Sequence, residues 1–271
     1  MKIELVQTDR MRVRYELCPL CDGTELIDLL RGDCSKHPVY QPAFPAELLW
    51  RGCEHCGHVF TDGYLTDQAL ELLFSRSVPS QRTGADCERQ RPISGRIVSR
   101  VSQVRGEVGG RWLDVGIGDG SLMTTAEEYG YDTVGLDLRR ESVDSLAALG
   151  YDARCLKLEE LEGEEEFDVV SLADSLEHMP FPVEVMKKVH ALLRPDGVVF
   201  LSMPNLDTYV WKQLDAAGTN PYWGELEHYH NFSREHLYWL LRRTGFEPVH
   251  YGISERYRSG MEVIAVRQGS A

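Results

Sequence analysis

The residues whose types and spacing most clearly imply chemistry form a glycine-rich turn in segment 111–121, Arg-Trp-Leu-Asp-Val-Gly-Ile-Gly-Asp-Gly-Ser. Three glycines at alternate positions follow Asp114: Gly116, Gly118 and Gly120. Apolar residues before the turn predict a buried strand, and the spacing after it predicts a helix that stops at Gly130. Such a turn brings bare N–H groups against a nucleotide-like ligand, because no Cβ stands in the way. The Asp114 carboxylate favours a ligand with a positive or hydroxyl-rich part over a pyrophosphate.

A second acid follows the next apolar stretch, Thr-Val-Gly-Leu-Asp at 133–137. Asp137 comes about 20 residues after Gly116, which is the spacing of an acid that binds ribose hydroxyls at the end of a second strand. Carboxylates only accept hydrogen bonds, so they suit hydroxyl and ammonium groups. The two acids and the turn therefore predict one ligand site.

Two C-x-x-C pairs near the N-terminus form a separate group: Cys18, Cys21, Cys53 and Cys56. Each pair offers two thiolates from one tight turn, and two such turns complete a tetrahedral zinc site. A site with four protein ligands has no open position for chemistry, so its role is to fold a segment too small for its own core.

The alternatives to a four-cysteine site remain open. Redox chemistry is the alternative for either pair alone, but it does not explain two similar pairs. Cys34 with His37, or His55 with His58, could replace a ligand. Residues 22–52 separate the pairs and must form a loop or hairpin, which prolines at 38, 42 and 45 predict to be irregular.

The elements that must position these residues alternate between strand and helix. Strands are expected at 112–115, 133–137, 152–155, 167–172, 198–203, 246–252 and 261–267, with helices at 65–76, 94–105, 141–149 and 234–244 and another from about 182. This pattern predicts an α/β fold with a doubly wound, mostly parallel, seven-stranded Rossmann-like sheet. A small zinc-ribbon-like domain precedes it. We expect the zinc-binding domain at 1–80, a linker at 81–93 and the sheet domain at 94–271.

The composition narrows the class of partner. A formal net charge of −14 argues against nucleic acid and against an anionic membrane surface. The sequence has no apolar run of roughly 18 residues and no signal-peptide pattern at its start. We therefore expect a cytoplasmic protein, whose cysteines are reduced or metal-bound. Nothing in the sequence specifies an oligomeric state.

Further motifs follow the glycine turn in a fixed order: 113–120, 134–137, 167–170 (Phe-Asp-Val-Val), 176–178 (Leu-Glu-His), 193–197 (Leu-Arg-Pro-Asp-Gly), 203–205 (Met-Pro-Asn) and the aromatic- and histidine-rich segment 223–246. Together they resemble the class I S-adenosylmethionine-dependent methyltransferases, and the last is similar to the signature of their small-molecule branch. The two cysteine pairs resemble the N-terminal zinc-binding segment of some bacterial natural-product and sugar methyltransferases. The resemblance covers nearly the whole chain.

The resemblance implies a role for each matched position. The three glycines pass beneath the methionine part of S-adenosylmethionine, and Asp114 helps to hold its amino group. Asp137, followed by Leu138, accepts both ribose hydroxyls. Leu158 and Glu159 lie where the family contacts adenine, although the usual acid is missing at Cys155. Ala173 and Asp174 flank the methionine moiety and the substrate.

The implied reaction is in-line transfer of a methyl group to a small molecule, such as a sugar or natural-product intermediate. O-methylation is favoured over N- or C-methylation. A hydroxyl nucleophile needs a group that removes its proton. The catalytic candidates are His228 and His178, and the other candidates are His230, Glu225 and Glu227. A structural hydrogen bond is the alternative role of His178, and packing is that of His230.

Two other functions fit the same residues. An enzyme of this fold can attack another carbon of S-adenosylmethionine, giving aminocarboxypropyl transfer or cyclisation. Methylthioadenosine as the by-product would distinguish that chemistry from methyl transfer. The other alternative is a non-catalytic, zinc-containing binding protein, which the intact glycine turn and Asp137 argue against.

Overall fold

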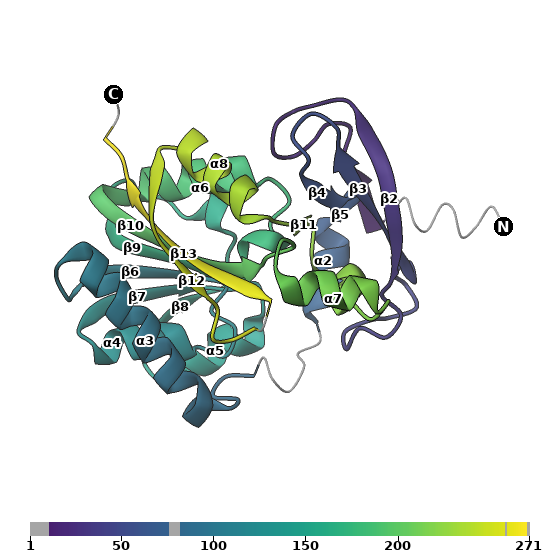
Figure 1. The fold of residues 1–271 in the computed structure, drawn as a ribbon. Coiled ribbons are helices and arrows are strands. Elements are labelled where there is room, and N and C mark those ends of the chain that lie inside the picture. The colour runs from purple at the N-terminus through teal and green to yellow at the C-terminus, as the bar shows by residue number, and fades with distance from the viewer. Residues whose placement is uncertain (1–10, 76–81, 258, 270–271) are drawn as a thin grey trace. The chain divides into compact units, whose positions relative to one another are not determined.

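The computed structural model describes residues 11–75, 82–257 and 259–269, and the chain divides into two compact units (Figure 1). Unit 1 takes in the described residues up to 75 together with 177–182 and 205–236, and unit 2 takes in the rest. The sequence instead predicted that everything from residue 94 onward forms one domain. The later segments join unit 1 because β11 (His230–Asn231) pairs antiparallel with β4 (Val59–Thr61).

Unit 1 is built on a four-stranded sheet in the order β11-β4-β3-β2. Strands β2 (Leu26–Asp33) and β3 (Glu47–Cys53) form a hairpin between the two cysteine pairs, and the three prolines lie in its connection, where no ladder hydrogen bond is lost. The remaining elements of the unit are β1 (Arg12–Arg14), β5 (Gly63–Leu65), α2 (Asp67–Phe74), α7 (Tyr209–Ala216) and the 3₁₀ turn η4 (Pro221–Gly224). Thr66 caps α2 by accepting a hydrogen bond from the Ala69 N–H. The predicted end of this helix, residue 76, lies outside the described residues.

Unit 2 contains the seven-stranded, mostly parallel sheet that the sequence predicts, so the fold class is confirmed. Its order is β12-β13-β10-β9-β6-β7-β8. The bounds are β6 (Gly110–Val115), β7 (Tyr131–Leu136), β8 (Asp152–Arg154), β9 (Phe167–Ala173), β10 (Leu193–Pro204), β12 (Phe246–Ile253) and β13 (Gly260–Arg267). The β12–β13 hairpin adds antiparallel strands at one edge. The central strands β6 and β9 are mostly buried and apolar because helices cover both faces of the sheet, although Asp114 and Ser171 are buried within them.

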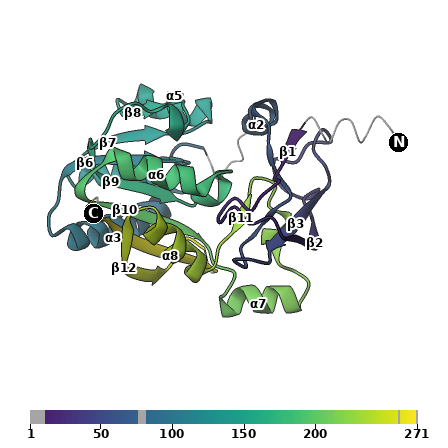
Figure 2. The same cartoon turned by 90° about the horizontal axis from the view of Figure 1, so that it is seen from above.

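Helices α3 (Cys87–Arg105), α4 (Ser121–Glu128) and α5 (Arg140–Ala148) lie on one face of the sheet, with α6 (Pro182–Leu192) and α8 (Arg234–Arg243) on the other (Figures 1 and 2). Helix α3 begins at Cys87, within the stretch predicted as a linker, because Ile93 packs into the core. Residue 81, where that predicted linker starts, lies outside the described residues. Among the described helices, none has the length and apolar character needed to cross a bilayer.

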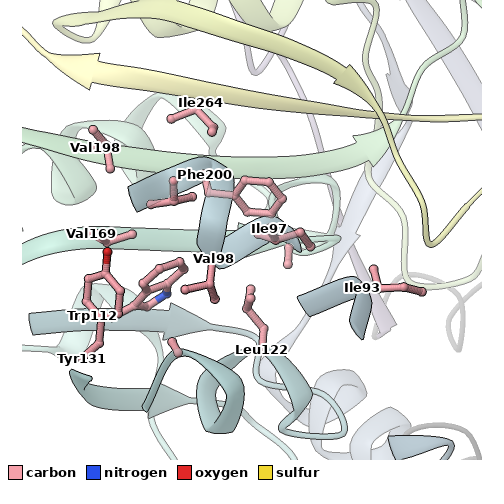
Figure 3. Packing of buried hydrophobic residues seen from close by; sticks show 13 residues of the cluster. Ile93, Ile97, Val98, Trp112, Leu122, Tyr131, Val169, Val198, Phe200 and Ile264 are labelled. Carbon is pink, nitrogen blue, oxygen red and sulfur yellow. The ribbon is translucent and has the colours of Figure 1, made fainter. Parts of the chain in front are cut away.

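The core of unit 2 fixes the ends of the strands. Side chains of Ile97 and Val98 from α3 pack against Trp112, Val169 and Phe200 of the sheet (Figure 3), and all five are at most 1% exposed. Burying each such side chain contributes roughly 1.5–3 kcal/mol. The Trp112 indole N–H donates to the Ser171 hydroxyl at 2.8 Å, so the core also ties two neighbouring strands together just before their carboxyl ends.

Candidate functional site

The glycine turn joins β6 to α4, and its backbone requires glycine. Gly116 and Gly118 have φ values of 81° and 53°, in the left-handed region that L side chains rarely adopt. A Cβ on Gly116 would lie 2.4 Å from the Ser175 hydroxyl oxygen. A Cβ on Gly118, in contrast, would meet no atom of the described residues within 4 Å. The protein therefore leaves no room for a side chain at Gly116, whereas the space beside Gly118 is free of atoms of the described residues.

Asp137 follows β7 and faces this turn. Its two carboxylate oxygens accept hydrogen bonds from the Gly118 N–H at 3.1 Å and from the Arg139 N–H at 2.7 Å. The residue is 5% exposed. The structure therefore brings the two separate sequence signals, the turn and the second acid, together at the carboxyl ends of β6 and β7. Ligands bind at this position in open α/β sheets.

Asp114 lies at the base of the same turn and is 1% exposed. Its carboxylate accepts a 2.5 Å hydrogen bond from the Ser171 hydroxyl on the neighbouring strand β9. Burial raises the pKa of Asp114 to about 6, although the Ser171 hydrogen bond opposes this rise. A positive group placed beside a buried carboxylate stabilises its charged form.

Ala173 and Asp174 end β9, and Asp174 adopts a left-handed backbone with φ of 56°. One Asp174 oxygen accepts from the Ser202 hydroxyl at 2.9 Å. The other lies 3.6 Å from the guanidinium of Arg256, a residue of the turn between β12 and β13. This conformation is uncommon for residues other than glycine, but aspartate is among the side chains that adopt it most readily.

The three other predicted cofactor residues lie at the ends of β7 and β8. Leu138 is half-buried, and its carbonyl accepts a weak hydrogen bond from the Cys155 thiol at 3.8 Å. Leu158 is buried and Glu159 is exposed, both in the 3₁₀ turn η2 (Leu158–Glu160). The adenine contact assigned to them stays a prediction.

In unit 1 the four cysteines converge on one point. Their sulfur atoms all lie within 4.8 Å of one another, with 3.8 Å between Cys18 and Cys56 and 3.6 Å between Cys21 and Cys53. Thiolates about 2.3 Å from a tetrahedral zinc lie about 3.8 Å apart, so the group fits that ion. Burial raises the pKa of Cys18, and it raises that of Cys56 to about 12, so metal binding would release protons.

Three of the four alternative ligands have other partners. Cys34 donates to the Pro45 carbonyl at 3.0 Å, and His37 pairs with Glu225 at 2.9 Å. His58 hydrogen-bonds His230 at 3.1 Å, and His55 does not belong to the cysteine group. Only the four cysteines therefore make up this group in the described part of the chain.

His178 and His228 come together in unit 1. Their rings meet edge to face with centroids 4.6 Å apart, and ligand atoms of Glu177 and both histidines lie within 4.8 Å of one another. His178 Nδ1 also lies 3.1 Å from the Glu227 carbonyl oxygen. Burial, reinforced by the nearby His178, lowers the pKa of His228 well below 6.5. His228 is therefore neutral at pH 7 and can accept a proton.

The remaining acid–base candidates are held by their neighbours. His230 is buried between His58 and the Met179 carbonyl oxygen, at 3.1 and 3.0 Å, and burial lowers its pKa to about 4. This geometry supports the packing role. Glu225 pairs with His37, and Glu227 is 8% exposed beside His178.

Sequence reasoning missed two residues at the cofactor-side strand ends. Ser171 lies inside a buried strand, where a hydroxyl has no pattern of its own. Arg256 lies in a turn rich in serine, arginine and glycine that matches no motif. Its contact with Asp174 spans elements far apart in the sequence, which no local signal reveals.

Comparison with known proteins finds methyltransferases. A family model described as a methyltransferase domain matches residues 87–251, more than half of the chain. Ubiquinone biosynthesis O-methyltransferases of Actinobacillus pleuropneumoniae and Aliivibrio fischeri are 32% and 29% identical over 38% and 60% of this chain. The matches cover 49% and 77% of those proteins, so the chain spans about half the length of the first.

A solved structure shares the fold. The 1,6-didemethyltoxoflavin-N1-methyltransferase of Burkholderia thailandensis, solved with its substrate and S-adenosylhomocysteine, superposes with a TM-score of 0.56 at 22% identity. The superposition covers 79% of this chain and 97% of that one. The likeness extends beyond the sheet alone, since it includes most of the described chain.

Proposed function

This chain belongs to the methyltransferase domain family, and from that premise we propose that it transfers a methyl group from S-adenosylmethionine to an oxygen of a small molecule. The observation that carries the proposal is the pairing of an open glycine turn with a buried carboxylate, in which the Gly118 N–H donates to Asp137 at 3.1 Å. The curated relatives, named as O-methyltransferases, support oxygen as the acceptor atom.

The residues of unit 2 are complementary to S-adenosylmethionine in charge and leave room for it. Asp137 offers acceptor oxygens to the ribose hydroxyls, and the face of Gly118 leaves room for the chain of the cofactor. Asp114 and Asp174 suit its ammonium group and sulfonium centre, whereas a pyrophosphate would be repelled. When bound, S-adenosylmethionine supplies an electrophilic methyl group. The task of these residues is then to hold the cofactor in one orientation.

His228 accepts the proton of the acceptor hydroxyl in this proposal. It is neutral at pH 7 because burial lowers its pKa, and its Nδ1 is buried without a hydrogen-bond partner among the described residues. His178 contacts its ring and orients it. A positioned base of this kind contributes about 10²–10⁴-fold to the rate.

The cysteine group of unit 1 holds a structural zinc ion in this proposal. The four sulfur atoms have the separations that a tetrahedral ion requires, and they leave no ligand position open. Thiols that stay reduced for this purpose fit a cytoplasmic protein. The likeness of this segment to those of natural-product and sugar methyltransferases favours such molecules as acceptors.

The test is binding of S-adenosylhomocysteine by calorimetry, with product analysis on hydroxylated acceptors. Asp137→Ala should weaken binding about 100-fold, since it removes two hydrogen bonds to a charged group. Asp144→Ala, an exposed acid on α5, is the matched control and should bind normally. Equal affinity of both variants would refute the ribose assignment. Methylthioadenosine in place of S-adenosylhomocysteine as the product would refute methyl transfer.

A further inference from the structure

The turn between β12 and β13 carries an arginine to the carboxyl ends of the central strands. The Arg256 N–H donates to the Ser254 hydroxyl at 3.2 Å, and the Ser254 N–H donates to the Gly260 carbonyl at 3.0 Å, so the turn is closed on itself. The Arg256 side chain is 17% exposed. A long, flexible cation is thus held largely out of water at one place in unit 2.

Two carboxylates of the predicted cofactor site surround this guanidinium. Asp174 lies 3.6 Å from its Nη1, which is ion-pair distance but longer than a good hydrogen bond. Asp114 is close enough for the charge of Arg256 to lower its pKa. Arg256 therefore stands in the field of both acids that flank the methionine end of the predicted site.

The hydrogen-bonding capacity of Arg256 is not filled by these neighbours. Its Nε is buried and has no hydrogen-bond partner among the described residues. The adjacent Glu255 is already paired with Arg96 and Arg100 of α3. A buried donor without an acceptor costs free energy of about 1–3 kcal/mol, and a planar guanidinium is best satisfied by a carboxylate that takes two of its N–H groups.

The amino-acid end of S-adenosylmethionine presents such a carboxylate beside an ammonium group. Asp114 and Asp174 favour the ammonium but repel the carboxylate, so a cation must offset them. We infer that Arg256 binds the carboxylate of the cofactor's methionine moiety and thereby selects S-adenosylmethionine over adenosine derivatives that lack this group. This inference rests on the proposed function, because it assumes that cofactor.

The test measures binding of two probes by calorimetry: S-adenosylhomocysteine and S-adenosyl-3-thiopropylamine, which keeps the ammonium but lacks the carboxylate. The wild-type chain should prefer S-adenosylhomocysteine. Arg256→Met should weaken its binding about 10- to 100-fold, the size of a charged hydrogen bond, and leave the amine probe unchanged. Arg256→Lys should recover part of the loss, because it keeps the charge but loses the planar fork.

Arg96→Met is the matched control, since it removes an ion pair to the same turn without touching the proposed subsite. It should leave both affinities unchanged. An equal loss for both probes in Arg256→Met would overturn the inference, because Arg256 would then act only by holding Asp174. Unchanged binding of S-adenosylhomocysteine would overturn it as well. Failure of the wild-type chain to bind S-adenosylhomocysteine would instead refute the proposed cofactor itself.

Discussion

His228 combines burial with an unfilled hydrogen-bonding position at Nδ1. Tyr222 stacks on its ring with centroids 6.5 Å apart, and His178 meets its edge. Nevertheless, its Nδ1 has no partner among the described residues. His230, two residues later, has partners on both ring nitrogens, at His58 and at the Met179 carbonyl. The Nδ1 of His58 is also buried without a partner among the described residues, so what sets His228 apart is its position beside Glu177 and His178.

Replacing His228 with alanine should lower kcat about 10²–10⁴-fold and leave the affinity for S-adenosylhomocysteine unchanged. Turnover is measured as S-adenosylhomocysteine released with a methylated hydroxyl acceptor. His250→Ala, a change on β12, is the control and should retain full turnover. Normal turnover of His228→Ala would reduce this residue to a packing role.

The pH dependence of kcat/KM for the wild-type chain should also reveal His228 as the base. Because burial lowers the pKa of His228, its neutral form persists as the pH falls through 6.5, the ordinary histidine value. The acidic limb of kcat/KM is therefore expected below pH 6.5 and should disappear in His228→Ala. An acidic limb at or above pH 6.5, or one unchanged by the substitution, would contradict this assignment.

Individual residues were predictable to different degrees. The grouping of the four cysteines and the position of Asp137 beside the glycine turn could be predicted, because a repeated spacing marks the former and a strand end marks the latter. Their roles as ligands stay predictions. Arg256 could not, because its role depends on the pairing of β12 with β13 and β10, which no local pattern specifies. The contact of His228 with His178 likewise joins segments that are distant in sequence.

At the scale of elements, the β2–β3 hairpin depends on the cysteine group at its base. Cys53 ends β3, and Cys21 precedes β2, so a shared ion would close this hairpin. The exposed apolar side chains Ile27 and Leu29 show that β2 buries little surface of its own. A metal that replaces a missing core is the usual solution in so small a segment.

Cys18→Ser, or removal of metal by a chelator, should therefore destabilise the chain. We expect about one zinc ion per wild-type chain by elemental analysis and a loss of this ion in the variant. The Tm should fall by about 10 °C, because each kcal/mol corresponds to roughly 2–4 °C for a chain of this size. Cys87→Ser, an exposed cysteine outside the group, is the control. A metal-free wild-type chain with an unchanged Tm would disprove the zinc site.

The boundaries of elements were less predictable than their existence. The strand expected at 198–203 begins earlier, because residues 194–197 form an irregularity inside β10 where Asp196 has a φ of 62° and the register with β9 shifts. A turn residue and a bulge residue share the same preferences, so the sequence does not distinguish them. Similarly, the sequence predicted a linker at 81–93, but α3 begins at Cys87, contains Pro92 and buries Ile93.

At the scale of the whole molecule, the chain passes repeatedly between the two units, and each unit contains three separate segments. The sequence suggested two consecutive domains, because a change of composition near residue 80 is visible and long-range pairing is not. Tyr229 shows the interleaving: its hydroxyl accepts from the Leu65 N–H at 3.3 Å, and its carbonyl accepts from the Thr61 N–H at 2.9 Å.

A fragment of residues 82–271 should consequently fold poorly. It keeps β11 but lacks β4, and it exposes Tyr229 and Phe232, which are 2% and 1% exposed in the full chain. We expect strong binding of a hydrophobic dye and aggregation on gel filtration, with the full-length chain as the control. A monomeric fragment that melts cooperatively and binds S-adenosylhomocysteine normally would support two independent consecutive domains instead.

The pairing of β11 with β4 also has a consequence during protein synthesis. The ribosome completes β2, β3 and β4 early, and the cysteine turns can bind metal as soon as Cys56 has emerged from the exit tunnel. The outer edge of β4 then remains unpaired until His230 and Asn231, which follow much later in the chain, have been synthesised. Until they arrive, the nascent chain presents an unpaired strand edge, which is where contacts between growing chains begin. Efficient expression should therefore depend on chaperones that cover this edge until β11 pairs with it.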